Sequence, residues 1–209
     1  MNVYIENSSN DYRQMFAKLG YTVVSDVDEA SLVCFTGGED VSPVMYGDAT
    51  HHTTYNNLAR DVKEQRLFNH CLENGIAMVG ICRGGQFLNV MSGGRMYQDI
   101  SEHCGDHSIT DTRTGDTIYV SSTHHQMIMP SEKALVVATA ALGGTREWYD
   151  GEIFRKDVSK EDIEVVYYEH TNCLCFQPHP EFSRPHYAQM TEYFGGLLVE
   201  LLSYQTVEN

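Results

Sequence analysis

Short apolar runs separated by segments of helical periodicity organise the first half of the chain. The runs that predict buried strands lie at residues 3–6, 21–24, 32–35 and 76–81. Helical periodicity follows the first and third of these runs, over residues 11–19 and 56–74. The second of these helices is expected to bury a stripe made of Leu58, Val62, Leu67, Cys71 and Leu72. A further helix is expected between residue 82 and about Ser92.

The second half of the chain is richer in strand patterns. Extended runs are predicted at residues 117–120, 134–139, 163–168 and 174–176. A closing amphipathic helix is predicted over residues 186–204, with a buried stripe of Met190, Tyr193, Phe194, Leu197, Leu198 and Leu201. Strands that alternate with helices up to residue 92 are typical of βαβ units. We therefore predict an α/β fold with a doubly wound, mostly parallel, flavodoxin-like sheet flanked by helices, and extra strands in the C-terminal half.

Length and charge restrict the classes of protein to which this chain can belong. The 209 residues are expected to form a single domain over 1–209. A formal net charge of −15 argues against nucleic acid or an anionic membrane as partner. The longest apolar run, 134–142, is too short to cross a bilayer. Scattered cysteines and a first segment without signal-peptide features favour a reduced, cytoplasmic protein.

Ten histidines raise the question of a metal site. The candidates are the pairs 51–52 and 124–125 and the cluster of His103, Cys104 and His107. None of them has the paired spacing that is typical of zinc ligands. We therefore expect no metal and no cofactor.

The segment Gly80-Ile81-Cys82-Arg83-Gly84 is the most informative motif. A cysteine between glycines, at the junction of a predicted strand and a helix, matches the nucleophile elbow, in which the chain turns sharply and exposes the nucleophile. The N-terminus of the following helix favours the thiolate. A buried structural cysteine is the alternative interpretation of Cys82.

A second motif, His179-Pro180-Glu181, follows the apolar run at 174–176. A cysteine nucleophile needs a base to accept its proton, and the base needs an orienting acceptor. In extended chain, residues two apart point to the same face. His179 and Glu181 are therefore candidates for the base and its partner.

A third motif, Gly37-Gly38, follows the run at 32–35, where backbone N–H groups at a strand end could bind an oxyanion. A tight turn is the alternative.

Taken together, the motifs resemble the class I glutamine amidotransferase superfamily and, within it, the γ-glutamyl hydrolase type, such as γ-glutamyl-γ-aminobutyrate hydrolases. The resemblance covers nearly the whole chain. It rests on Gly37-Gly38-Glu39-Asp40-Val41-Ser42-Pro43 with Tyr46-Gly47, Arg60-Asp61 with Glu64, Gly80-Ile81-Cys82-Arg83-Gly84 with Gln86 and Asn89, Gly93-Gly94 with Gln98-Asp99, Ser122 with His124-His125-Gln126, and His179-Pro180-Glu181.

The resemblance implies specific roles for these residues. Cys82 would be the nucleophile, His179 the base and Glu181 its orienting partner, and the N–H groups of Gly38 and Arg83 would form the oxyanion hole. The substrate's glutamyl group would lie near Gly37, Gln86, Ser122, His124, His125 and Gln126. Pro178 and Gly85 depart from the family's pattern, which has a bulky aromatic and a large apolar residue there. The segment 179–185 resembles the glutaminase domain of CTP synthases more than it resembles a typical hydrolase.

Three functions remain as alternatives. The first is a cysteine-dependent hydrolase that cleaves γ-glutamyl amide bonds of a small molecule through a γ-glutamyl thioester. The second is a glutaminase subunit that delivers ammonia to a separate synthetase, which would then be an obligatory partner. The third is a non-catalytic binding module of the same fold, against which the retained cysteine argues.

Overall fold

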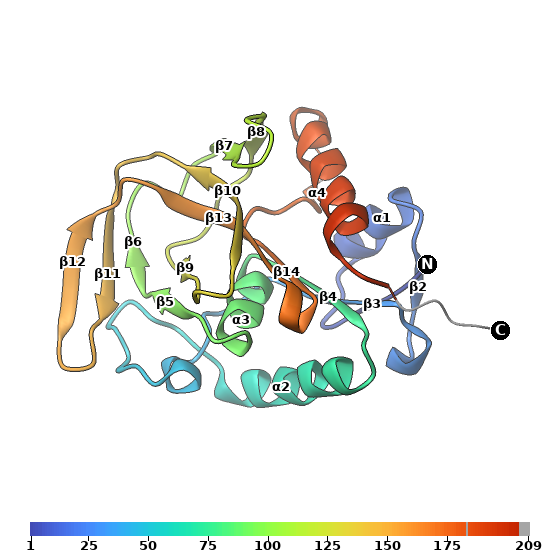
Figure 1. The fold of residues 1–209 in the computed structure, drawn as a ribbon, viewed down its shortest axis with the longest axis horizontal. Coiled ribbons are helices and arrows are strands. Elements are labelled where there is room, and N and C mark those ends of the chain that lie inside the picture. Colours follow the sequence, from blue (N-terminus) through green and yellow to red (C-terminus); the bar gives the residue numbers. More distant parts are fainter. Residues whose placement is uncertain (183, 205–209) are drawn as a thin grey trace.

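The computed structural model describes residues 1–182 and 184–204, and its centre is a nine-stranded sheet (Figure 1). The strand order is β2-β1-β3-β4-β14-β13-β10-β7-β8. Parallel pairing joins β2 (Thr22–Val24), β1 (Asn2–Ile5), β3 (Leu32–Phe35), β4 (Ala77–Ile81) and β14 (Cys173–Phe176). Antiparallel pairing continues the sheet through β13 (Asp162–Tyr168), β10 (Leu135–Ala140), β7 (His107–Asp111) and β8 (Thr117–Val120). The predicted α/β class, with extra strands from the C-terminal half, is confirmed.

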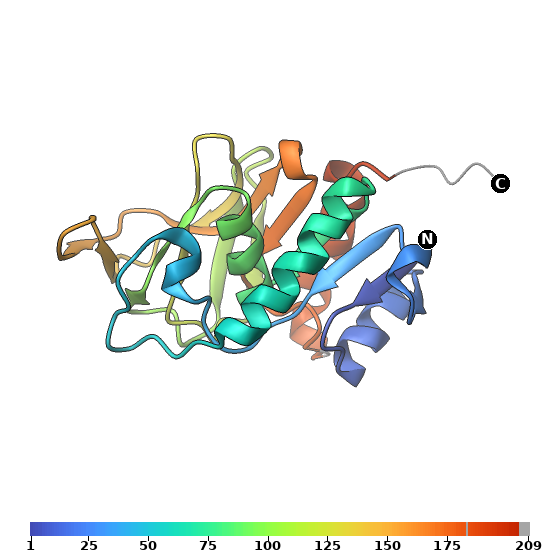
Figure 2. The same cartoon turned by 90° about the horizontal axis from the view of Figure 1, so that it is seen from below.

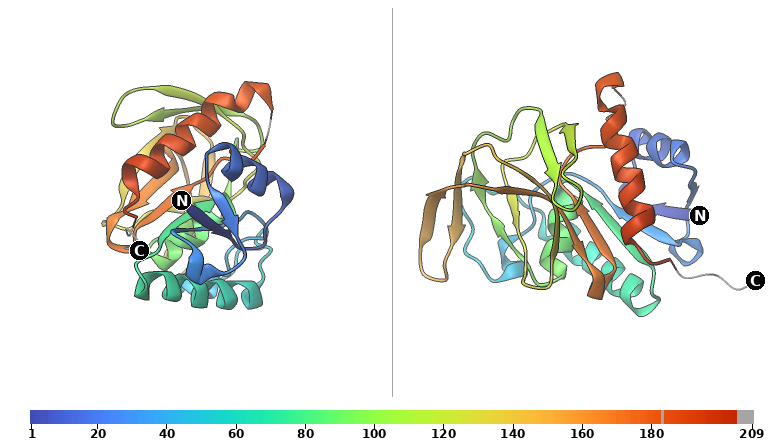
Figure 3. Two further views of the ribbon diagram at one scale, coloured as in Figure 1. Left: turned by 90° about the vertical axis from the view of Figure 1, so that its right-hand side faces the viewer. Right: turned by 45° about the horizontal axis from the view of Figure 1, so that its top comes forward.

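Helices cover both faces of the parallel part of the sheet (Figure 3). One face carries α1 (Asn10–Lys18) and α4 (Ala188–Leu201), which contribute Phe16 and Phe194 to the first core cluster. The opposite face carries α2 (Leu58–Glu73) and α3 (Arg83–Met91), which contribute Phe68 and Phe87 to the second. Across the described ranges, no helix is long and apolar enough to cross a membrane.

Two smaller sheets extend the molecule beyond the central one. One contains β6 (Asp99–Ile100), β11 (Thr145–Tyr149) and β12 (Phe154–Val158), and the other pairs β5 (Arg95–Tyr97) with β9 (Met127–Met129). The β11–β12 hairpin projects away from the helical layers in both Figure 1 and Figure 2. Short 3₁₀ turns lie at Val27–Glu29, Pro43–Tyr46, Glu169–Thr171 and Pro185–Tyr187.

The strands predicted from continuous apolar runs agree with the structure within a residue or two. The closing helix is shorter than predicted, because Pro185–Tyr187 forms a 3₁₀ turn and α4 ends at Leu201. The sequence reading missed β5, β6, β7, β9, β11 and β12. In β12 all residues after Phe154 are exposed, so this strand has no apolar run to detect.

The buried stripe predicted for α2 is only partly right: Cys71 is buried and Leu67 packs against the core, but the other three positions are exposed. Leu58, Val62 and Leu72 are 46%, 37% and 41% exposed. The buried residues of this helix are Asp61, Glu64, Phe68 and Cys71. Two carboxylates take inward positions because a buried arginine of α3 lies opposite them. A rule that assigns apolar residues to the interior cannot predict a helix that buries paired charges.

Candidate active site

Cys82 occupies a strained turn between β4 and α3. Its backbone has φ 53° and ψ −116°, a conformation that costs a non-glycine residue on the order of 1–3 kcal/mol. The turn is tight: a Cβ on Gly84 would lie 2.1 Å from the carbonyl oxygen of Phe35. The Cys82 N–H donates to the carbonyl oxygen of Phe176 at 2.8 Å, which fixes the turn to β14. This geometry is that of a nucleophile elbow.

His179 and Glu181 come from the end of the strand beside the elbow. Because β14 and β4 are parallel neighbours, the segments after them leave the same edge of the sheet. His179 Nδ1 lies 2.7 Å from Glu181 Oε1, and Ser121 Oγ accepts a hydrogen bond from the His179 N–H at 3.0 Å. The Phe182 ring stacks on the imidazole at a centroid distance of 4.6 Å. His179 and Glu181 are both buried.

The charge state of His179 depends on its neighbours. Burial lowers its pKa, but interactions with the side chains of Cys82 and Glu181 outweigh burial and raise the pKa to about 10. The imidazolium is therefore the favoured form at neutral pH. The positive ring lies between a potential thiolate and a carboxylate, which is the arrangement of charges that a cysteine–histidine nucleophile needs.

Cys82 is itself buried, and it differs from the other cysteines in its position at the elbow. Cys34, Cys71, Cys173 and Cys175 are buried, and burial raises the pKa of each thiol, for Cys71 and Cys173 to about 12. Cys104 is exposed but lies outside the elbow. Thiols with raised pKa values remain protonated and unreactive at neutral pH.

The Gly37-Gly38 loop lies beside the elbow because β3 and β4 are parallel neighbours. Gly38 has φ +147°, a conformation that favours glycine, and a Cβ there would lie 2.1 Å from Arg60 Nη1, so a larger residue would displace the Arg60 guanidinium. Arg83 is the first residue of α3, and its N–H has no intrahelical acceptor. A Cβ on Gly37 would lie 3.3 Å from His179 Cε1 and 3.7 Å from Cys82 Cβ. The loop, the elbow and the histidine thus meet at one point.

Tyr12, on α1, is a site residue that sequence analysis missed. Its hydroxyl accepts a hydrogen bond from the Gly37 N–H at 3.0 Å and also interacts with Glu181. Burial and the charge of Glu181 raise the pKa of Tyr12, so the phenol keeps its proton. The hydroxyl therefore connects the glycine loop to the acidic partner of His179. A single tyrosine in an amphipathic helix carries no signal that would identify this role.

The Arg83 side chain has a structural position, and its guanidinium is only 1% exposed. It forms ion pairs with Asp61 and Glu64 of α2. Arg60 Nε pairs with the same Glu64 at 2.8 Å. The Asp61 carboxylate also accepts a hydrogen bond from the Ser42 N–H at 3.0 Å. The Arg83 side chain is therefore a buried salt-bridge partner of α2.

Arg60 carries this network on to the glycine loop. Its Nη2 donates to the carbonyl oxygens of Thr36 and Gly37 at 3.0 and 3.1 Å, and its Nη1 pairs with Glu39 at 2.9 Å. The carbonyl oxygens of the loop point toward Arg60. The N–H groups of the loop therefore lie on its opposite side. The cluster of Arg60, Asp61, Glu64 and Arg83, here called the charge cluster, links the elbow to the loop.

Most of the side chains predicted to bind the glutamyl group have partners within the protein. Gln86 Nε2 donates to Gln126 O at 3.1 Å and to Gln177 Oε1 at 3.0 Å. Gln126 Nε2 donates to Thr54 Oγ1 at 3.0 Å and to Gln98 O at 3.1 Å. The buried Gln126 Oε1 has no hydrogen-bond partner within residues 1–182 and 184–204. It is the polar atom of this pair that a ligand could engage.

The remaining predicted binding residues divide into two groups. Ser122 Oγ donates to the carbonyl oxygen of His103, and His124 packs into a buried histidine cluster. By contrast, the His125 side chain is 40% exposed, and its Nε2 lies 3.2 Å from Asp40 Oδ1. Only His125 in this loop thus presents an ionisable group to solvent. The substrate roles of all these residues stay predictions.

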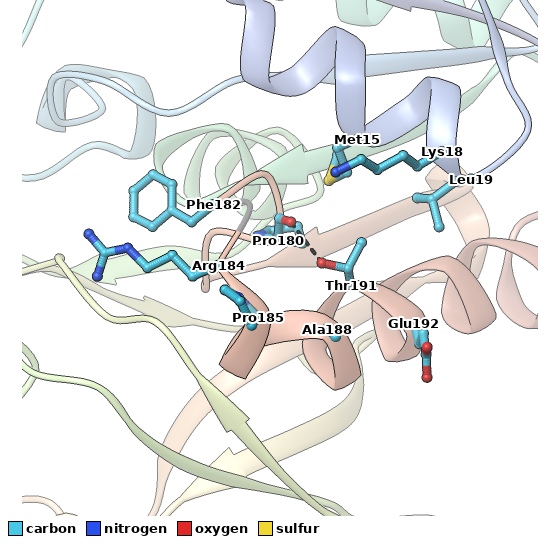
Figure 4. Close-up of a pocket in the computed structure, with 10 residues that line it drawn as sticks. All are labelled: Met15, Lys18, Leu19, Pro180, Phe182, Arg184, Pro185, Ala188, Thr191 and Glu192. Atoms are coloured by element: carbon cyan, nitrogen blue, oxygen red, sulfur yellow. Dashed lines mark hydrogen bonds between the residues drawn. The ribbon is translucent and has the colours of Figure 1, made fainter.

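A separate hollow of about 420 Å³ lies behind the His179–Glu181 segment (Figure 4). Met15 and Leu19 of α1, Pro180 and Phe182 of the segment, and Thr191 of α4 line it. Thr191 Oγ1 donates to the carbonyl oxygen of Pro180 at 3.0 Å. Neither Cys82 nor His179 lines this hollow, so it is distinct from the reaction site.

Comparison with known proteins agrees with this architecture. The family model described as Peptidase C26 matches residues 20–118. A Mycobacterium tuberculosis protein named "Putative glutamine amidotransferase Rv2859c" is 33% identical over 141 residues, which are 58% of this chain and 46% of that protein. The chain thus matches less than half the length of that relative. The glutamine amidotransferase-like protein YvdE of Lactococcus lactis is 28% identical over 97% of this chain and 90% of its own length.

The comparison of structures agrees with the comparison of sequences. A crystal structure of a glutamine amidotransferase from Thermotoga maritima superposes with a TM-score of 0.60 over 96% of this chain and 84% of that chain, at 16% identity. The matching family model and relatives support assignment to the class I glutamine amidotransferase-like superfamily, and the solved structure shares the fold.

The charge cluster generates a stability prediction. Arg83→Ala leaves the buried carboxylates of Asp61 and Glu64 without their shared partner, so the free energy of unfolding should fall by about 3–5 kcal/mol. Urea denaturation measures this change. Arg66→Ala, on the exposed side of α2, is the control and should cost about 0.5 kcal/mol or less. Equal stability of the two variants would contradict the structural role of Arg83.

The position of Tyr12 generates a kinetic prediction. Tyr12→Phe removes the hydroxyl that joins Gly37 to Glu181, so kcat should fall by about tenfold while KM changes little. Steady-state kinetics of both constants provide the measurement. The matched control is Tyr21→Phe, which removes a hydroxyl bonded to Tyr204 at 3.1 Å. If both phenylalanine variants kept wild-type kcat, Tyr12 would have no positioning role.

Proposed function

We propose that the chain is a cysteine-dependent hydrolase of γ-glutamyl amide bonds, in glutamine or in γ-glutamyl amines. The observation that supports this proposal best is the meeting of the strained Cys82 elbow with the bonded His179–Glu181 pair at one sheet edge. A strained turn at a nucleophile is a feature that a merely structural cysteine does not need. The names of the similar proteins support the glutamine amide as a substrate class.

In the proposed reaction, the Cys82 thiolate attacks the γ-carbonyl carbon of the substrate. The charge that develops on the carbonyl oxygen is accepted by the N–H groups of Gly38 and Arg83. The His179 imidazolium then gives its proton to the leaving nitrogen, the C–N bond breaks, and the γ-glutamyl group remains as a thioester on Cys82. Glu181 holds Nδ1, so that Nε2 faces the reacting atoms.

The second half of the reaction uses the neutral imidazole left behind. His179 takes a proton from water as the water oxygen attacks the thioester carbon, and the C–S bond breaks. Free glutamate leaves, and the thiolate and imidazolium are restored. No net proton is gained or lost by the two residues over the cycle.

The substrate's α-carboxylate must be bound without the nearest arginines. Arg83 and Arg60 are both committed to carboxylates of the charge cluster. Neutral donors, such as backbone N–H groups and side-chain amides, are therefore the proposed partners of the glutamyl group. Gln126, with its unpartnered Oε1, is the proposed acceptor for the α-amino group.

A glutaminase subunit of a larger synthetase is the second candidate function. The names of the relatives and of the structural neighbour, all glutamine amidotransferases, favour it. In that case Cys82 would form the same thioester, but ammonia would pass to an acceptor on a partner protein. Loss of the nucleophile would have favoured a non-catalytic module, and Cys82 is retained.

The proposed function is tested by incubating the protein with glutamine and with a panel of γ-glutamyl amines. Release of ammonia or amine is measured, and the quenched enzyme is analysed by mass spectrometry for a γ-glutamyl group on the Cys82 peptide. Cys82→Ala should abolish both signals without loss of folding, and the exposed-cysteine variant Cys104→Ala should retain both. Turnover by Cys82→Ala would refute the mechanism. Turnover only after addition of a synthetase would select the second candidate.

The raised pKa of His179 generates a prediction about pH. Turnover needs the imidazolium, so kcat/KM should decline on the alkaline side, toward the pKa of about 10. Because Glu181 raises that pKa, Glu181→Gln should move the alkaline limb to lower pH. Glu192→Gln, a substitution on α4, should leave the limb in place. An alkaline limb that stays or moves upward in Glu181→Gln would refute the proposed role of Glu181.

A further inference from the structure

Three histidines and a glutamate meet in the interior, outside the proposed triad. His103, His107 and His124 surround Glu164, and all four side chains are almost completely buried. Glu164 Oε1 lies 3.3 Å from His103 Nδ1 and 3.4 Å from His107 Nε2, and Glu164 Oε2 lies 3.8 Å from His124 Nε2. These four residues are here called the histidine cluster.

The facing atoms of the histidine cluster make no hydrogen bonds with one another. His103 Nδ1, His107 Nε2, His124 Nε2 and both carboxylate oxygens of Glu164 are buried, and within the described residues none has a hydrogen-bond partner. Buried polar atoms are rarely left in this state, because each one costs free energy of desolvation. Side chains that shared only protons would close to about 2.7–3.0 Å. The observed spacings of 3.3–3.8 Å are longer.

The ring nitrogens that point away from Glu164 show where the hydrogens of His124 and His107 lie. His124 Nδ1 lies 2.9 Å from the carbonyl oxygen of Gln126, and His107 Nδ1 lies 3.2 Å from that of Gly105. A carbonyl only accepts, so each of these Nδ1 atoms carries a hydrogen, and in the neutral ring each Nε2 presents a lone pair to Glu164. His103 Nε2 faces Asp162 Oδ2 at 3.4 Å. A carboxylate faced in this way calls for a cation, which either an added proton on an imidazole or a bound metal ion supplies, and the long spacings favour the metal ion.

The spacing fits a metal ion. Ligand atoms about 2.0–2.1 Å from a tetrahedral ion lie about 3.3–3.4 Å apart along each edge. One ligand atom each from His103, His124 and Glu164 can be chosen so that all three lie within 4.8 Å of one another. Imidazole and carboxylate ligands in a tetrahedral set favour Zn²⁺, and outer hydrogen bonds from the histidines to carbonyl or carboxylate oxygens are usual around such ions.

We propose that His103, His124 and Glu164 bind a structural Zn²⁺, and that His107, which lies 3.4 Å from Glu164 but outside the set of three whose ligand atoms all lie within 4.8 Å of one another, turns in as the fourth ligand. Four protein ligands leave no open position for a substrate, so the ion would hold the fold together and take no part in the reaction. It would join the segment before β7, the loop at 121–126 and strand β13. The same loop contains Ser121, whose hydroxyl accepts the His179 N–H. The ion would therefore brace the side of the site that carries His179.

The ligands come from three separate segments, so no local spacing predicts them as one site. His103, His107 and His124 are among the metal candidates of the sequence, but their spacing is not that of zinc ligands. Glu164 lies in an apolar strand pattern. Only the pairing of β13 with β10, and of β10 with β7, brings these segments together.

The experiment uses the whole chain, without a histidine tag, purified in the absence of chelators. Elemental analysis should find about one equivalent of zinc per chain, and removal by a chelator should lower Tm. Returning Zn²⁺ at about 1,000 times its Kd should raise Tm by about 8–16 °C. Replacement by Co²⁺ should give absorption bands of a four-coordinate site. These measurements on the wild-type chain do not depend on any variant folding.

Variants then assign the ligands. Glu164→Gln and His103→Asn should lose the zinc equivalent and the Tm response to added Zn²⁺. The matched controls are Glu161→Gln and His52→Asn, which change exposed side chains of the same kinds and should keep both. A wild-type chain that neither contains nor binds Zn²⁺ or Co²⁺ would overturn the proposal. So would Glu164→Gln and His103→Asn variants that bind zinc as the wild type does.

Discussion

The buried pairing of Arg83 with Asp61 and Glu64 is the interaction on which the arrangement of the site depends. Arg83 directly follows Cys82, the proposed nucleophile, and its side chain is held by the two carboxylates of α2. Through Glu64 the same carboxylates hold Arg60, which binds the carbonyl side of the glycine loop. The elbow and the glycine loop, the two backbone segments proposed to bind the oxyanion, are thus positioned by a single set of charges. Such a cluster is costly to desolvate, and its value lies in fixing geometry.

The parallel part of the sheet places these segments within reach of one another. β3, β4 and β14 are adjacent and parallel, so the glycine loop, the elbow and the His179–Glu181 segment leave the sheet at one edge. Tyr12 adds a fourth attachment from α1 on the opposite face of the sheet. Because each contact comes from a different element, the geometry of the site is a property of the whole parallel half.

The elements predicted correctly from sequence were those with local signals. Strands buried on both faces, such as β3 and β4, appear as continuous apolar runs. The Cys82 and His179 motifs are contiguous and could be recognised in the same way, and their catalytic roles stay predictions. Features that depend on distant partners were not predictable. The inward face of α2 is polar only because Arg83 lies opposite, the exposed strand β12 has no apolar face, and Tyr12 gains its role from Gly37 and Glu181. The histidine cluster could not be predicted, because only the antiparallel pairing of the C-terminal strands brings its residues together.

The two halves of the sheet therefore contribute differently to function. The chemical groups proposed for bond cleavage lie at the edge of the parallel half, where adjacent strands and the charge cluster fix them. The loop at 121–126, which is proposed to face the glutamyl group, follows β8 at the edge of the antiparallel half. His124 Nε2 of this loop faces Glu164 Oε2 of β13 at 3.8 Å, and Ser121 connects the loop to His179. A change in the histidine cluster would thus act on substrate binding and on the position of His179 at once, without touching Cys82.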